Sequence, residues 1–125
     1  MADDRSVVEQ AYGAFGRGDI GALLELLHDD VEWLSPRTLP QGGAFHGKAE
    51  VGKFFEGVGG AWDPLAVEVE GLGDIGGGLV AAVVRGEGTL RGGGPSGYGS
   101  VHVFTVRDGK ISRFREYTDI DGPLA

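Results

Sequence analysis

The residues best suited to acid–base chemistry gather in one segment near the end of the chain, VHVFTVRDGKISRFREYTD, which spans positions 101–119. His102 and Glu116 stand there among valines and phenylalanines. Burial beside apolar groups raises the pKa of a carboxyl group, and a carboxyl group with a raised pKa can both take up and release a proton in catalysis. The segment therefore indicates a proton-transfer site centred on Glu116.

The spacing within this segment decides whether the two ionisable groups can act together. Asp108-Gly109 tolerates the positive φ angles of a tight turn, so it predicts a two-residue hairpin. Strict alternation from that turn places His102 and Glu116 on opposite faces. They share a face only if an extra residue, a β-bulge within positions 112–117, interrupts the pairing. Without such a bulge we expect Glu116 in the pocket, because its neighbours form the more apolar face.

A second pair of charges lies earlier in the chain. Arg85 and Glu87 are two residues apart, so they share one face of a strand and can form an ion pair. Residues 79–84 are apolar on both faces, which indicates a covered strand. We therefore expect this pair to face the pocket, and a pair on the sheet surface is the alternative.

Histidines and aromatic residues have a structural reading beside the functional one. The three histidines lack the spacing of a metal site, and cysteine is absent, so we predict no metal and no cofactor. His102 could equally be a buried histidine of the core. The aromatic residues that we expect both in the core and in the walls of a pocket are Tyr12, Trp33, Phe54, Phe55 and Phe104.

The elements that position these groups follow from periodicity and capping residues. Asp3 or Asp4 can begin a first helix, Asp19 can begin a second that buries residues as far as Leu27, and a third is predicted over 48–58. Strands are predicted over 31–35, 65–72, 79–90 and in the hairpin. Helices followed by antiparallel strands predict a single α+β domain over 1–125, with three N-terminal helices packed in the concave face of a curved sheet.

Composition narrows the classes of partner. The formal net charge of −8 argues against nucleic acid and anionic membranes. No apolar run reaches membrane-spanning length, and the acidic start does not match a signal peptide, so a cytoplasmic location is expected.

The order of three segments, GRGDIGALLELLHDDVEW, FHGKAEVGKFF and VFTVRDGKISRFREYTD, resembles the SnoaL-like branch of the nuclear transport factor 2-like superfamily. The resemblance covers nearly the whole chain. It implies a cone-shaped fold with a deep apolar pocket between sheet and helices, and a homodimer formed through the outer face of the sheet. The fold alone does not define the reaction, since it serves many chemistries and some binding roles.

Three groups within that superfamily suggest different chemistry. The resemblance to SnoaL-type polyketide cyclases places Glu116 near their acid–base carboxylate. The resemblance to limonene epoxide hydrolases matches two of their charged motifs with Arg85-Gly86-Glu87 and Arg115-Glu116-Tyr117 of this chain. Trp33 and Ser35 stand in place of the tyrosine and asparagine that hold the water in those enzymes.

Ketosteroid isomerase is the third comparison. Ser35 stands where its general base lies, and His102 stands where its oxyanion-stabilising acid lies. Tyr12 is a neighbour of its helix-one tyrosine. Its mechanism therefore does not transfer unchanged.

Two hypotheses follow. The first is a cofactor-independent acid–base enzyme of cyclase, isomerase or hydrolase type, acting on a small apolar oxygenated molecule. In it Glu116 moves a proton, Arg85 stabilises an oxyanion, and Glu87 and His102 orient them. The expected ligand contacts are Tyr12, Trp33, Phe55, Phe104 and Asp119, in a pocket large enough for a drug-sized ligand. The second hypothesis is a binding protein of the same fold without turnover.

Overall fold

The computed structural model describes residues 3–118, so Asp119 lies outside the described residues. Three helices precede or interrupt the strands: α1 (Asp4–Gly16), α2 (Ile20–Glu25) and α3 (Gly47–Ala61). Six strands form the rest: β1 (Leu27–Ser35), β2 (Gly43–His46), β3 (Trp62–Gly76), β4 (Leu79–Leu90), β5 (Pro95–Arg107) and β6 (Lys110–Thr118).

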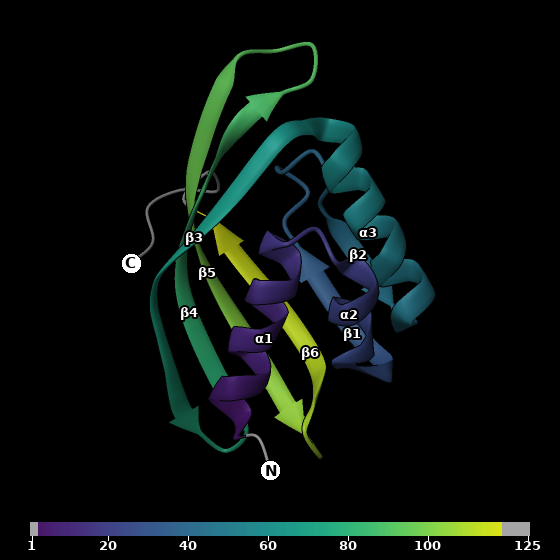
Figure 1. Cartoon of the computed structure of the whole chain (residues 1–125), viewed down its shortest axis with the longest axis vertical. Coiled ribbons are helices and arrows are strands. Elements are labelled where there is room, and N and C mark those ends of the chain that lie inside the picture. Colours follow the sequence, from purple (N-terminus) through teal and green to yellow (C-terminus); the bar gives the residue numbers. More distant parts are fainter. Residues whose placement is uncertain (1–2, 119–125) are drawn as a thin grey trace.

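The strands form one sheet in the order β2-β1-β6-β5-β4-β3. β1 pairs with β6 in parallel, and the other neighbours are antiparallel. All three helices lie on one face of the curved sheet (Figure 1). This architecture confirms the predicted α+β fold with helices in the concave face of the sheet.

Helix α1 begins where its capping residue predicts. The carboxylate of Asp3 accepts a hydrogen bond from the backbone N–H of Ser6 at 2.7 Å, which satisfies one of the free donors of the first turn. The helix buries four residues against the sheet, namely Val7, Val8, Ala11 and Ala14. Tyr12 is partly buried on the same side and packs against this core.

The stretch after α2 differs from the prediction. Helix α2 ends at Glu25, and Leu27 and His28 already belong to β1. The reason is tertiary: Leu27 is fully buried and pairs with Ile111 of β6. Propensity alone extends the helix to Leu27, but pairing with an otherwise unpaired edge of β6 is more favourable.

The hairpin between β5 and β6 contains the predicted turn and the predicted bulge. Asp108 and Gly109 have φ angles of 55° and 77°, as a two-residue turn requires. Val106 pairs with Ile111, whereas Thr105 pairs with Arg113, so Ser112 is the extra residue. From Arg113 onward every side chain lies on the face opposite to the one that strict alternation predicts.

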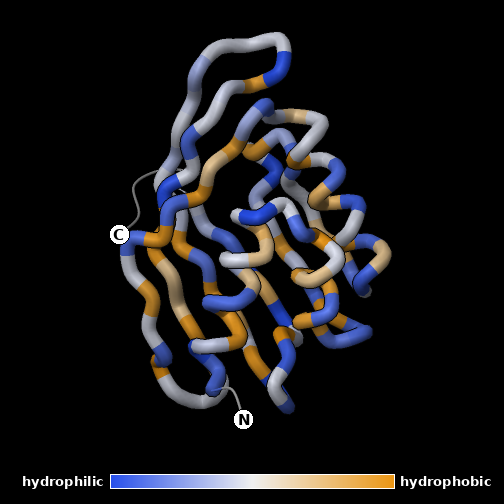
Figure 2. The backbone as a smooth tube through the Cα atoms, in the orientation of Figure 1, coloured by the Kyte–Doolittle hydropathy of each residue, from blue (hydrophilic) through white to orange (hydrophobic). Residues whose placement is uncertain are grey.

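Side chains alternate between the two faces of the sheet along β4 and β5. Figure 2 shows the corresponding alternation of apolar and polar residues along the strands. The apolar inner face and the helices enclose the main core, and a smaller cluster of Leu39, Trp62 and Tyr98 lies beside it. The candidate site lies between these two clusters on the inner face.

Candidate active site

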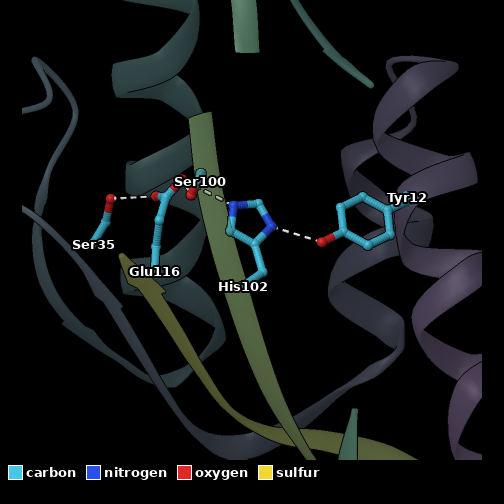
Figure 3. A network of polar contacts seen from close by, with 5 residues as sticks. All are labelled: Tyr12, Ser35, Ser100, His102 and Glu116. Carbon is cyan, nitrogen blue, oxygen red and sulfur yellow. Dashed lines mark hydrogen bonds and ion pairs between the residues drawn. The ribbon is translucent and has the colours of Figure 1, made fainter. Parts of the chain in front are cut away.

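Glu116 is the centre of a buried polar network. Its side chain is 5% exposed, and it accepts three hydrogen bonds from neighbouring strands (Figure 3). Ser35 of β1 donates to Oε1 at 2.7 Å, Ser100 of β5 donates to Oε2 at 2.9 Å, and His102 Nε2 lies 2.9 Å from Oε2. The carboxylate is therefore held by residues from both strands that flank β6.

These donors determine the charge of the carboxyl group. Burial alone raises the pKa of Glu116, but the hydrogen bonds from His102, Ser35 and Ser100, together with attraction to His102, outweigh it and lower the pKa below its ordinary value. The sequence indicated a raised pKa, which is wrong. The reason is that apolar neighbours in the sequence do not show which donors surround the folded side chain. Glu116 is thus an ionised acceptor at neutral pH.

His102 connects Glu116 to helix α1. Its Nδ1 lies 2.6 Å from the hydroxyl oxygen of Tyr12, and the two rings are nearly parallel, with their centroids 5.9 Å apart (Figure 3). An ionised carboxylate only accepts hydrogen bonds, so Nε2 carries a proton, and in the neutral form of the imidazole Nδ1 accepts from Tyr12. The result is a chain from Tyr12 through His102 to Glu116 that can pass a proton between its members.

Tyr12 is the end of this chain that lies on helix α1. Burial raises the pKa of its hydroxyl, and the negative charge of Glu116 raises it further. Tyr12 is therefore a protonated hydrogen-bond donor rather than a tyrosinate.

The network lines a mainly apolar cavity with a free volume of about 70 Å³. Its walls come from α1, α3 and the inner face of the sheet and include Ala11, Tyr12, Phe15, Trp33, Phe55, His102, Phe104 and Glu116. The predicted lining by Trp33, Phe104 and side chains of the first helix is confirmed. Sites for drug-sized ligands typically have volumes of several hundred Å³, so the cavity is smaller than predicted and suits a compact ligand.

One buried donor in this wall has no partner. The indole Nε1 of Trp33 is inaccessible to solvent and forms no hydrogen bond within residues 3–118. Its ring stacks on Phe114, with the centroids 3.9 Å apart. A buried donor without an acceptor costs free energy.

The structure does not bring Arg85 and Glu87 to the cavity. They form an ion pair at 2.9 Å, but their side chains are 50% and 67% exposed on the outer face of β4. The expectation that this pair faces the pocket is therefore wrong. Alternation in β4 turns Val84 and Gly86 inward and Arg85 outward, and apolar residues on both faces arise here because the outer face itself is partly apolar.

The sequence analysis named Ser35 only in the family comparisons and did not single out Ser100, although both hydrogen-bond to Glu116. Ser35 follows Trp33 by two positions and Ser100 precedes His102 by two, so the period of a strand could have placed them on the same face as these site residues. Gln41 and Tyr98 also line the cavity. Gln41 comes from the segment between β1 and β2, where no periodicity exists to place a side chain.

Other site types find no support in residues 3–118. These residues contain no group of three or more His, Asp or Glu side chains that could hold a metal ion. None of the helices described there is long and apolar enough to cross a membrane.

The family follows from comparison with known proteins. The model of the SnoaL-like domain matches residues 8–114. The chain belongs to the SnoaL-like family. No curated protein matches it. This membership agrees with the resemblance seen in the sequence. The cavity between helices and sheet agrees with it too.

Solved structures agree with this assignment. A nuclear transport factor 2-like protein from Burkholderia thailandensis is 29% identical with a TM-score of 0.89, and the match covers 95% of this chain and 92% of that one. TerC, co-crystallised with polyporic acid, is 26% identical with a TM-score of 0.83, covering 94% and 92%. A provisionally named polyketide cyclase from Pseudomonas putida shares the fold at 24% identity and a TM-score of 0.74, covering 94% and 92%.

Proposed function

We propose that this SnoaL-like protein is a cofactor-independent acid–base enzyme for a small, largely apolar molecule that carries a carbonyl group. The observation that carries the proposal is the hydrogen-bonded chain Tyr12–His102–Glu116 in the wall of an apolar cavity. A histidine between a phenol and an ionised carboxylate is suited, in its neutral form, to take up a proton and to hold the resulting charge.

The proposed reaction begins at the carbon next to the substrate carbonyl. Tyr12 turns its O–H from His102 to the carbonyl oxygen, and this uncovers the lone pair of Nδ1. His102 Nδ1 then takes the proton from the adjacent carbon, and the C–H electron pair moves into an enolate. The Tyr12 hydroxyl stabilises the negative oxygen, and the Glu116 carboxylate, 2.9 Å from Nε2, stabilises the imidazolium.

The same proton completes either of two reactions. Its return from Nδ1 to another carbon of the enolate gives an isomer. If the enolate carbon instead attacks a second carbonyl of the substrate, a C–C bond forms and His102 protonates the new alkoxide, which is a cyclisation. Neither route needs a redox partner. These roles differ from those in the hypothesis drawn from the sequence. Here His102 moves the proton, and Glu116 positions His102 and stabilises its imidazolium form.

A comparison with a solved structure supports an oxygenated ligand. TerC, at 26% identity, was crystallised with polyporic acid, a small organic molecule. A protein of this fold thus accommodates a small organic ligand.

Proton abstraction can be measured without the natural substrate. The probe is 2-tetralone, a compact apolar ketone, incubated in D₂O while NMR follows exchange of the hydrogens next to its carbonyl. We expect the wild-type protein to accelerate exchange and His102→Gln to lose the acceleration. Equal exchange rates in the two proteins, with 2-tetralone bound by both, would favour the second candidate, a binding protein without turnover.

We also propose a homodimer through the outer face of the sheet. Val83 and Tyr117 on this face are 50% and 48% exposed, which is unfavourable for large apolar groups unless they are covered. A second copy of the chain would cover these apolar residues. The cytoplasmic location stays a prediction.

A further inference from the structure

A second group of polar side chains lines the same cavity and is not used by the proposed reaction. Gln41, Trp62 and Tyr98 are 6%, 4% and 5% exposed. Gln41 and Tyr98 line the cavity, and the Trp62 ring lies 6.1 Å from the ring of Tyr98. Such thoroughly buried polar groups need a purpose or a full set of partners.

The hydrogen bonds among these three residues have a fixed direction. Trp62 Nε1 donates to Gln41 Oε1 at 3.1 Å, and an indole N–H can only donate. The amide oxygen of Gln41 therefore faces Trp62, and its NH₂ group is free to face the Tyr98 hydroxyl, with which Gln41 is hydrogen-bonded. The Tyr98 oxygen is then the acceptor, so its own O–H remains available to donate to another group.

The backbone of β4 makes room for this hydroxyl. Tyr98 pairs directly with Gly86, and a Cβ atom on Gly86 would lie 2.6 Å from Tyr98 Cζ and 2.9 Å from its hydroxyl oxygen. The phenol thus lies across β4, while Glu116 stands on β6. Because β4 and β6 flank β5 on opposite sides, the two polar groups lie on opposite sides of that strand.

The protonation state of Tyr98 suits a donor. Burial and the negative charge of Glu116 raise its pKa, and the hydrogen bond from Gln41 lowers it by less. The hydroxyl is therefore protonated throughout the neutral range.

We propose that the Tyr98 hydroxyl, oriented by Gln41, binds a second oxygen of the substrate that does not react. This inference rests on the proposed function and narrows its substrate class. The substrate then carries two oxygen functions on a compact apolar frame, with the reacting one at Tyr12 and His102 and a hydrogen-bond acceptor such as a carbonyl at Tyr98. Tyr98 would be a specificity-determining residue, because a ligand without the second oxygen leaves its donor unpaired.

The test compares two phenols of similar size by isothermal titration calorimetry. 4-Hydroxyacetophenone carries a second oxygen, and 4-ethylphenol does not. We expect Tyr98→Phe to lower the affinity for 4-hydroxyacetophenone about fivefold, the weight of one neutral hydrogen bond, and to leave that for 4-ethylphenol unchanged. Tyr117→Phe, which removes a hydroxyl from the outer face, is the matched control and should change neither affinity.

Each outcome decides the proposal. A ratio of the two affinities that Tyr98→Phe does not change, or an equal loss for both phenols, would overturn it, since the second result indicates a structural role. Absence of binding of both phenols to the wild-type protein would overturn it too. The proposed reaction is judged separately, by the deuterium exchange of 2-tetralone in wild-type protein and His102→Gln, so either idea can fail while the other stands.

Discussion

His102 on β5 and Glu116 on β6 face each other, with Nε2 2.9 Å from Oε2, because the bulge leaves Ser112 without a paired residue in the register of β5 and β6. Ser112 Oγ instead donates to the carbonyl oxygen of Thr105 at 3.2 Å, across the irregular pair. A single added residue thus turns Glu116 from the outer face to the cavity, since the side-chain period of a strand is two. The bulge therefore brings the members of the polar network together.

Substitution Glu116→Gln tests the role of the charge. The variant keeps the shape of the side chain but removes the carboxylate that stabilises an imidazolium at His102. We expect exchange of 2-tetralone to fall about a hundredfold, within the range of acid–base contributions. The control is Glu87→Gln, which alters an exposed carboxylate outside the cavity. A Glu116→Gln protein with the wild-type exchange rate would exclude Glu116 from the mechanism.

The lowered pKa of Glu116 predicts how stability depends on acid. The folded protein binds this proton less readily than the unfolded chain, in which the glutamate has its ordinary pKa of 4.5. The stabilising effect of the carboxylate is therefore fully present above that value, and it is lost as the pH falls through the lower, folded pKa. Urea unfolding of wild type and Glu116→Gln should give free energies whose difference shrinks from about pH 7 to about pH 3. A difference independent of pH would contradict the assignment.

The raised pKa values of Tyr12 and Tyr98 predict how stability depends on alkaline pH. Both groups have an ordinary pKa of 10.0 that folding raises, so above this pH the unfolded chain loses protons that the folded protein keeps. Each tyrosine then lowers the free energy of unfolding by about 1.4 kcal/mol per pH unit. Urea unfolding between about pH 10.5 and 11.5 should show how steeply the free energy of unfolding falls with pH. Compared with the wild type, this fall should be smaller by about 1.4 kcal/mol per pH unit in Tyr12→Phe, and by twice that amount in the double variant Tyr12→Phe/Tyr98→Phe. Slopes equal to that of the wild type would show that the hydroxyls ionise in the folded state.

How much the sequence could predict is clear from particular residues. The Asp3 cap and the Asp108-Gly109 turn depend on local chemistry, and they were predictable to within a residue. β4 has the predicted bounds, Leu79–Leu90. The face of Arg85 was not predictable, because an apolar strand has no polar alternation to show which side is covered.

The composition of the candidate site was predictable only in part. Tyr12, Trp33 and His102 come from strongly patterned elements, whereas Gln41 lies in a segment without a period and is placed by its contact with Trp62. The pKa direction of Glu116 was missed for a related reason. It depends on Ser35, which is 81 residues away in the sequence.

The Arg85–Glu87 pair should contribute little to stability or activity. Both side chains are at least half exposed, and exposed ion pairs contribute about 0–1 kcal/mol. We expect Arg85→Ala and Glu87→Ala to change the free energy of unfolding by less than about 1 kcal/mol and to leave 2-tetralone exchange unchanged. Loss of exchange in either variant would return the pair to the catalytic site.

The outer face gives the last prediction. Val83, Val101 and Tyr117 stand side by side on β4, β5 and β6 and form an apolar row on that face. A homodimer through it would bury on the order of 1,200 Å² or more, the size of a stable interface. Sedimentation at high micromolar concentration should show a dimer for the wild-type protein and a monomer for Val83→Asp, because a carboxylate in this row would lose its hydration without gaining a partner. Ile75→Asp is the matched control: Ile75 is 62% exposed near the end of β3, beyond that row, and its replacement should leave association unchanged. A wild-type monomer, or equal association of wild type and Val83→Asp, would contradict a dimer through this face.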